Sequence, residues 1–234
     1  MEVLSMQQKH SIRLFFFLIS GATAVAITSD LLAQQPVAQV QIVADGMCCN
    51  GCAQKVGAQL YTAPGVSNVQ ADVPNRLVTI TFRPSPKLTL GGIWAATERA
   101  DGKPSKLMTT QATYTLQRPE QLQLSEPLHP GRYWIVVEKL TSDEEIEKAI
   151  KQLRVIRGVK SANCDRASRT FFVETAPNEV LSPWVALGAM EQSGHTTQSV
   201  MGPYGLFSIE RVKERAVPVT AAQQQQQQQQ GSVR

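Results

Sequence analysis

Three of the four cysteines in this 234-residue chain lie within a five-residue window, at Cys48, Cys49 and Cys52. Cys49 and Cys52 have the C-x-x-C spacing, which lets two sulfur atoms reach one metal ion. Thiolate is the form of cysteine that binds metal, and soft sulfur ligands select Cu(I), Zn(II) and heavier ions over hard cations such as magnesium. A disulfide staple and a redox-active thiol pair also use this spacing, so both remain open alongside a metal site.

A strand and a helix are expected on either side of the cysteines. Residues 40–43 have the alternating, β-branched character of a strand, and residues 53–60 have the apolar spacing of a helix. Cys49 should therefore lie in the connecting loop and Cys52 in the first helical turn. The partial positive charge and free N–H groups at a helix N-terminus lower thiol pKa values and so favour the thiolate.

The chain contains an internal repeat without gaps, with an offset of 93 residues between Gly65 and Gly158. The same offset aligns Asp72 with Asp165, and it runs from about residue 40 to residue 118. Two copies of one domain follow, and a repeat this long predicts that each copy folds around its own core.

Each copy is predicted to have the element order β-α-β-β-α-β, which is the ferredoxin-like α+β sandwich. The first copy is expected at 37–116, with strands at 37–43, 66–72, 77–82 and 106–116 and helices at 51–60 and 90–100. The second is expected at 132–212, with strands at 133–137, 159–165, 170–175 and 200–209 and helices at 142–154 and 183–193. Residues 117–131 are rich in proline and are predicted to be a linker.

The first copy resembles the heavy-metal-associated domain of copper metallochaperones, mercury-binding periplasmic proteins and metal-transporting P-type ATPases. Residues 46–52, Gly-Met-Cys-Cys-Asn-Gly-Cys, fill the family pattern Gly-Met-x-Cys-x-x-Cys, and Gly65-Val66 begins the strand that follows the helix. The resemblance implies that Cys49 and Cys52 bind the metal and that Met47 packs beneath the loop. It also implies that Lys103 places a positive charge near the site.

Cys48 is an addition to the usual motif and is a candidate third ligand. A third thiolate would shift the preference from two-coordinate Cu(I) toward trigonal or tetrahedral sites for Zn(II), Cd(II), Pb(II) or Hg(II). Against this, the residue between the methionine and the first ligand cysteine normally points outward in the family.

The second copy lacks the thiolate site. The repeat places Leu140, Ser142 and Glu145 where the first copy has Met47, Cys49 and Cys52. We expect a degenerate copy that is structural or docks a partner, with Ser142 capping an acidic helix start. Cys164 is alone on a predicted strand, where a buried apolar thiol is expected.

The two ends of the chain differ from its middle. Lys9 and Arg13 precede an apolar run that ends in small residues near Ala33. This order predicts a secretory signal peptide at 1–33, and hence a secreted or periplasmic protein, with an uncleaved membrane anchor as the alternative. The glutamine-rich stretch at 213–234 is expected to be disordered.

The functional hypothesis is an exported protein that binds a soft metal ion, with Cu(I) favoured, and transfers it to a protein partner or sequesters it. The net charge of +4 is scattered, which argues against nucleic acid as a partner, and no catalytic motif is found, so an enzyme is not expected. Two alternatives remain: a thiol-disulfide redox protein that uses the same C-x-x-C, and a non-catalytic interaction module.

Overall fold

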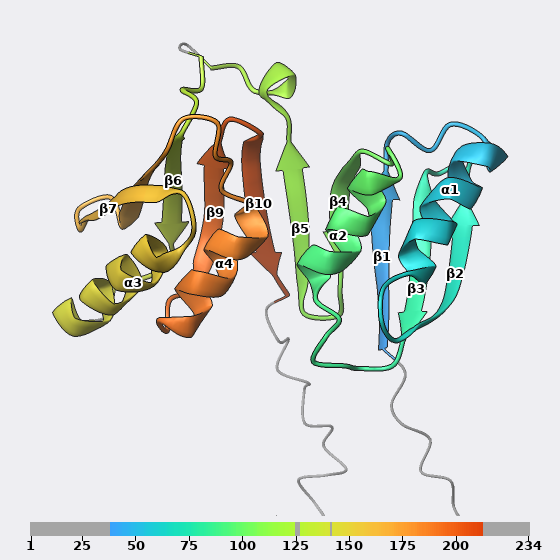
Figure 1. Cartoon of the computed structure of the whole chain (residues 1–234), viewed down its shortest axis with the longest axis horizontal. Helices are drawn as coiled ribbons and strands as arrows, with labels where there is room; N and C mark the ends of the chain where they lie inside the picture. Colours follow the sequence, from blue (N-terminus) through green and yellow to red (C-terminus); the bar gives the residue numbers. More distant parts are fainter. Residues whose placement is uncertain (1–37, 125–126, 141, 213–234) are drawn as a thin grey trace, which may run out of the picture. The chain divides into compact units, whose positions relative to one another are not determined.

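The computed structural model describes residues 38–124, 127–140 and 142–212 (Figure 1). The predicted signal peptide at 1–33 and the glutamine-rich tail at 213–234 lie outside these residues. Among the residues that are described, no helix is long and apolar enough to span a membrane.

The first unit has the predicted β-α-β-β-α-β order and then one further strand. Its elements are β1 (Ala38–Ala44), α1 (Asn50–Tyr61), β2 (Val66–Asp72), β3 (Leu77–Phe82), α2 (Leu90–Arg99), β4 (Pro104–Met108) and β5 (Ala112–Gln117). Alternate residues of β1 point into the core, where Val40, Ile42 and Ala44 are buried. This period of two is the pattern of a strand with one covered face.

The second unit repeats this arrangement after a short 3₁₀ helix, η1 (Pro119–Gln121). Its elements are β6 (Arg132–Val137), α3 (Asp143–Val155), β7 (Val159–Asp165), β8 (Thr170–Thr175), α4 (Pro183–Gln192), β9 (Thr197–Gly202) and β10 (Gly205–Arg211). The predicted cap of α3 is confirmed, since the Ser142 hydroxyl accepts the N–H of Glu145. The predicted α+β class and the two successive β-α-β-β-α-β units are also confirmed.

The repeat extends to details of turn geometry. The turns that follow β2 and β7 are each closed by an aspartate, Asp72 with Asn75 and Asp165 with Ser168. The equivalent residues Arg76 and Arg169 both have a φ of 53°. Such agreement between two left-handed positions is what two copies of one domain require.

The last strand of each copy was predicted wrongly. Residues 106–116 and 200–209 do not form single strands, because each range contains a turn that separates two antiparallel strands. In the first copy the Thr109 hydroxyl accepts the N–H groups of Gln111 and Ala112 and thereby closes the turn. A threonine that satisfies backbone groups locally favours a turn over a continuing strand.

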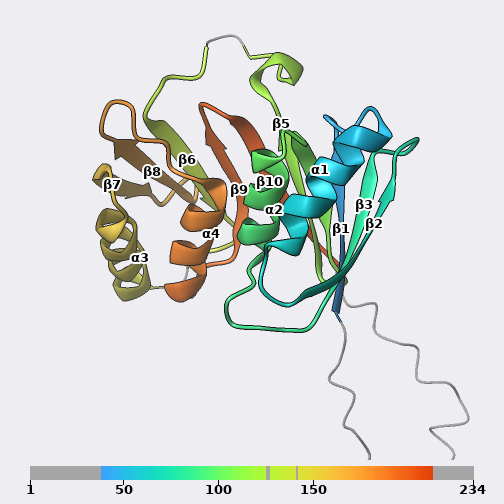
Figure 2. The ribbon, with the colours of Figure 1, turned by 45° about the vertical axis from the view of Figure 1, so that its right-hand side comes forward.

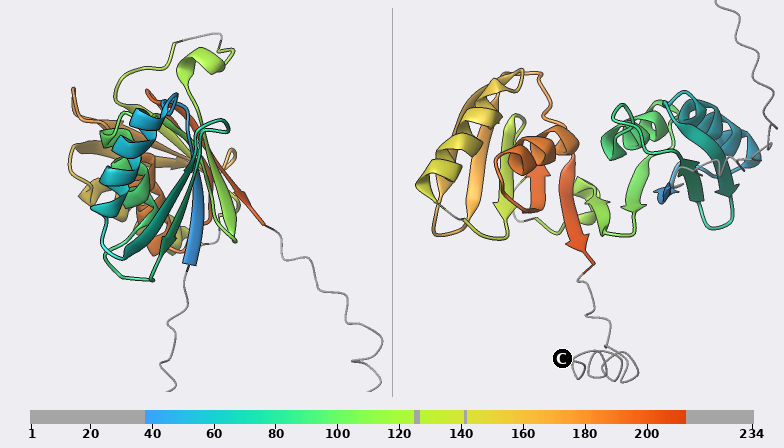
Figure 3. Two further views of the ribbon diagram at one scale, coloured as in Figure 1. Left: turned by 90° about the vertical axis from the view of Figure 1, so that its right-hand side faces the viewer. Right: turned by 90° about the horizontal axis from the view of Figure 1, so that it is seen from below.

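The extra strands join the two units. β5 pairs antiparallel with β10, so the sheet has ten strands in the order β2-β3-β1-β4-β5-β10-β9-β6-β8-β7. Thr115 lies opposite Ser208, its own equivalent in the repeat, so the pairing has local two-fold symmetry. The helices cover one face of the strands of their own unit (Figures 2 and 3).

The expectation that each copy folds around its own core was also wrong, because one buried cluster includes residues of both units. Phe207 of β10 is fully buried and its ring lies 5.8 Å from Trp94, 6.1 Å from Tyr114 and 5.1 Å from Trp184. The bulky Trp184 side chain fits against its repeat equivalent, Gly91, where an added Cβ would lie 2.9 Å from the Cβ of Trp184. We call the cluster of Trp94, Tyr114, Trp184 and Phe207 the aromatic junction. It forms because the two units have different residues, Gly91 and Trp184, at equivalent positions.

Candidate metal centre

The loop that carries the cysteines, between β1 and α1, is held by backbone hydrogen bonds to the segment between α2 and β4. The N–H of Gly46 donates to the carbonyl of Gly102 at 2.9 Å, and the N–H of Asp45 donates to the carbonyl of Lys103 at 3.2 Å. A Cβ at position 46 would collide with the carbonyl oxygen of Asp101. Glycine is therefore required at position 46 because two backbone segments approach too closely for any side chain.

Met47 anchors the loop to the core. Its side chain is fully buried, and its N–H donates to the carbonyl of Ala44 at 2.9 Å. Burying a methionine side chain stabilises a fold by about 1.5–3 kcal/mol. The loop is thus held on the side facing the core, while the next two residues, Cys48 and Cys49, are exposed.

Cys49 is the N-cap of α1. Its backbone is extended, with φ −155° and ψ 168°, and its sulfur accepts the N–H of Cys52 at 3.3 Å. The first turn of α1 contains no acidic residue. The helix terminus therefore offers its positive end to the sulfurs without a competing carboxylate.

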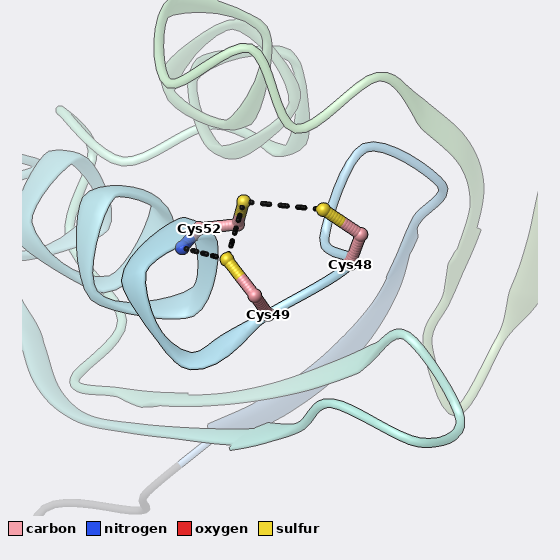
Figure 4. Close-up of side chains that lie close together, drawn as sticks. All are labelled: Cys48, Cys49 and Cys52. Atoms are coloured by element: carbon pink, nitrogen blue, oxygen red, sulfur yellow. Dashed lines mark hydrogen bonds between the residues drawn. The ribbon is translucent and has the colours of Figure 1, made fainter.

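The three sulfur atoms form one cluster (Figure 4). The Sγ of Cys52 lies 3.1 Å from that of Cys49 and 3.5 Å from that of Cys48, and all three lie within 4.8 Å of one another. Cys48 therefore does not point away from the site, as the usual motif led us to expect. All three are free cysteines, two of them exposed and Cys52 half-buried.

The other predicted residue, Lys103, lies beside the loop but makes its contact there through the backbone. Its carbonyl accepts from Asp45, its φ is 47°, and its side chain is exposed. Sequence reasoning gave no role to Gly102, whose carbonyl holds Gly46 and whose Cα faces Thr97 and Val56 too closely for a side chain. The Gly102-Lys103 pair was the feature of the sequence from which this close approach of the two backbone segments could have been predicted.

Cys164 lies far along the chain, on β7 of the second unit. It is half-buried rather than fully buried, and burial raises the pKa of its thiol. A raised pKa disfavours the thiolate, so Cys164 serves as a matched control for the cluster cysteines.

In the second unit, the equivalent loop and helix start carry different side chains. Ser142 caps α3, and Glu145 stands at the position of Cys52. His195 stands at the position of Gly102 and is buried, with its Nδ1 3.2 Å from the Ser193 hydroxyl and its ring 5.5 Å from Phe171. The second unit therefore fills this region with an imidazole where the first unit has a glycine.

Burial lowers the pKa of His195 below its ordinary value of 6.5, and the Glu145 carboxylate only partly opposes this effect. The folded state thus prefers the neutral ring. The neutral His195 ring therefore stabilises the fold in full above pH 6.5, and this stabilisation is lost as the pH falls through the lowered pKa.

We expect the free energy of unfolding, measured in urea, to fall between pH 7.5 and 5 by more in the parent than in His195→Gln. An equal pH dependence in the parent and in His195→Gln would contradict the assignment.

The comparisons agree with this geometry at the level of the domain. Residues 42–100, about a quarter of the chain, match the model of the family described as heavy-metal-associated domain. The match spans the loop, all three clustered cysteines and both helices of the first unit. Residues 42–100 are thus a heavy-metal-associated domain, the class of metal-binding module that the sequence motif indicates. A comparison with curated protein sequences gives no match.

Three solved structures illustrate the likeness. Oxidized MerP from Ralstonia metallidurans CH34 is 26% identical, covering 32% of this chain and 100% of its own, with a TM-score of 0.28. The water-soluble region of the P-type ATPase CopA from Bacillus subtilis is 17% identical, covering 79% and 97%, with a TM-score of 0.29. The yeast copper transporter domain Ccc2a is 18% identical, covering 36% and 96%, with a TM-score of 0.25.

Proposed function

We propose that the protein binds a soft metal ion, with Cu(I) favoured, between the thiolates of Cys49 and Cys52, and passes the ion on to a partner protein by ligand exchange. The observation that carries the proposal is the sulfur cluster at the start of α1, within the residues that match a heavy-metal-associated domain. Two sulfurs on a helix terminus can hold a monovalent ion whose preferred ligands are soft.

The position of the cluster suits transfer. Cys48 and Cys49 are exposed, and Cys52 is half-buried on the first turn of the helix. An incoming thiolate can therefore reach a bound ion from solvent before both original sulfurs have left it. The buried Met47 holds the loop during this exchange, since its side chain lies in the core.

The proposal includes export through the predicted signal peptide at 1–33, which would place the site in a secreted or periplasmic setting. An oxidising compartment converts exposed thiol pairs to disulfides, so a metal ion that occupies the pair also protects it. The second unit takes no metal in this proposal and serves as the structural neighbour of the first.

The test is an anaerobic titration of the reduced full-length chain with Cu(I) against a competing chelator. We expect one Cu(I) per chain, held in competition with the chelator and released to a second thiol-bearing protein on mixing. If the chelator removes all Cu(I) at equal concentration, or if the number of bound ions does not depend on the cluster cysteines, the proposal fails.

A further inference from the structure

We propose that Cys48 supplies a third thiolate, so that the cluster also takes soft divalent ions of the cadmium and mercury class in a three-sulfur site. This inference rests on the proposed function, since it extends the same metal centre. It concerns a residue that the Gly-Met-x-Cys-x-x-Cys pattern leaves unspecified.

The three cysteines lie at the start of α1 and in the loop before it. Cys49 is the N-cap, three residues before Cys52, and Cys48 precedes it by one residue. The extended backbone of Cys49 turns the chain at the N-cap and leaves Cys48 in the preceding loop. Its sulfur then reaches Cys52 from the loop side, as Figure 4 shows.

The sulfur separations are close to those that a metal ion requires. With metal–sulfur bonds of about 2.3 Å, the length found for zinc, the sulfurs of a trigonal site are about 4 Å apart and those of a linear site about 4.6 Å apart. The Cys49 and Cys48 sulfurs lie 3.1 and 3.5 Å from that of Cys52, and no pair exceeds 4.8 Å. A trigonal ion therefore requires these pairs to widen by less than about 1 Å, whereas a linear ion requires the Cys49–Cys52 pair to widen by about 1.5 Å.

The loop that carries Cys48 is held in a fixed position. The N–H of Cys48 donates to the carbonyl of Gly46 at 3.1 Å, and Gly46 is itself bonded to Gly102. Met47, between them in sequence, is fully buried. Because the backbone on the N-terminal side of Cys48 is held in this way, a third thiolate is presented to the ion with little ordering of the chain on binding.

The net charge of the loaded site favours a divalent ion when three thiolates bind. Two thiolates around Cu(I) carry a net charge of minus one, and three thiolates around a divalent ion carry the same net charge. Three thiolates around Cu(I) would carry minus two, which the helix terminus offsets less completely. The third thiolate thus adds affinity chiefly for divalent ions. Soft divalent ions are selected because every ligand is sulfur.

The test uses Cd(II) on the reduced full-length chain carrying Cys164→Ser, so that all remaining thiols belong to the cluster. We expect Cd(II) to protect three thiols from a thiol reagent and to give a sulfur-to-cadmium absorption band in the ultraviolet. Adding Cys48→Ser should leave two protected thiols and weaken Cd(II) binding by at least about tenfold, because even the loss of an outer-sphere partner costs 10–100-fold.

Two outcomes would overturn the inference: protection of only two thiols in the parent, or a Cd(II) affinity in Cys48→Ser within about twofold of the parent. Failure of the proposed function is separate, because it is measured with Cu(I) and with Cys49→Ser. Circular dichroism of each variant checks folding, and the exposed position of Cys48 makes its replacement by serine structurally mild.

Discussion

Replacement of Cys49 by serine is expected to abolish tight binding of Cu(I). Cys49 is both a proposed ligand and the N-cap whose sulfur accepts the N–H of Cys52. Serine is also a good N-cap, so the variant keeps the helix start while removing the soft ligand. Loss of an outer-sphere partner alone weakens metal sites by 10–100-fold, so we expect loss of a direct ligand to cost more than about 100-fold in affinity.

The matched control is Cys164→Ser, which removes a thiol of raised pKa in the second unit and should leave Cu(I) affinity unchanged. Competition with a chelator measures the Cu(I) affinity of each protein in one experiment. The proteins compared are the parent, Cys49→Ser, Cys52→Ser and Cys164→Ser. Equal affinity in the parent and Cys49→Ser would show that the ion binds elsewhere. The variants also separate metal binding from redox function, since a thiol-disulfide protein would lose reductase activity in Cys49→Ser but bind Cu(I) weakly in every form.

Replacement of Phe207 by alanine is expected to cause the largest loss of stability, about 3–5 kcal/mol in the free energy of unfolding. Phe207 is fully buried and its ring contacts the aromatic side chains of both units, including Trp94 and Trp184. The deletion removes buried apolar surface and leaves a cavity at the junction where β5 and β10 pair. Urea unfolding, followed by tryptophan fluorescence, measures the effect because two tryptophans line the junction.

Phe172→Ala provides the control, since Phe172 is 39% exposed on β8 and should cost less than Phe207. A core shared by the two units also predicts that the parent unfolds in a single transition. Two well-separated transitions in the parent, with Phe207→Ala affecting neither by more than about 1 kcal/mol, would contradict a common core.

Much of the fold was accessible from sequence because periodicity and turn residues are local signals. The strand at Ala38–Ala44 and the helix that starts beside Cys49 follow from alternating and helical spacing. The split of the last strand was missed, since Thr109 and Thr110 favour strands by propensity, whereas here the Thr109 hydroxyl and a backbone bond from Thr109 to Ala112 close a turn. The pairing of β5 with β10 was missed for a different reason, because it joins residues about 90 positions apart and no local pattern encodes it.

The candidate site, like the fold, could be predicted from sequence only in part. The spacing of Cys49 and Cys52 and their place on a strand-to-helix loop were predictable, because helix geometry fixes which residues share a face. The direction of the Cys48 side chain was not, since it depends on how Gly46 and Met47 hold the loop against Gly102 and the core. The 93-residue offset places His195 at the position of Gly102, but the burial of its ring was not predictable, because burial is a property of the packed second unit.

The most direct test of the central claim is X-ray absorption spectroscopy at the copper edge of the reduced chain loaded with one Cu(I). We predict a first shell made only of sulfur in the parent, lost or replaced by lighter ligands in Cys49→Ser and Cys52→Ser, and retained in Cys164→Ser. A first shell dominated by nitrogen or oxygen in the parent, or a sulfur shell that persists unchanged without Cys49 and Cys52, would contradict a thiolate metal centre at the start of α1.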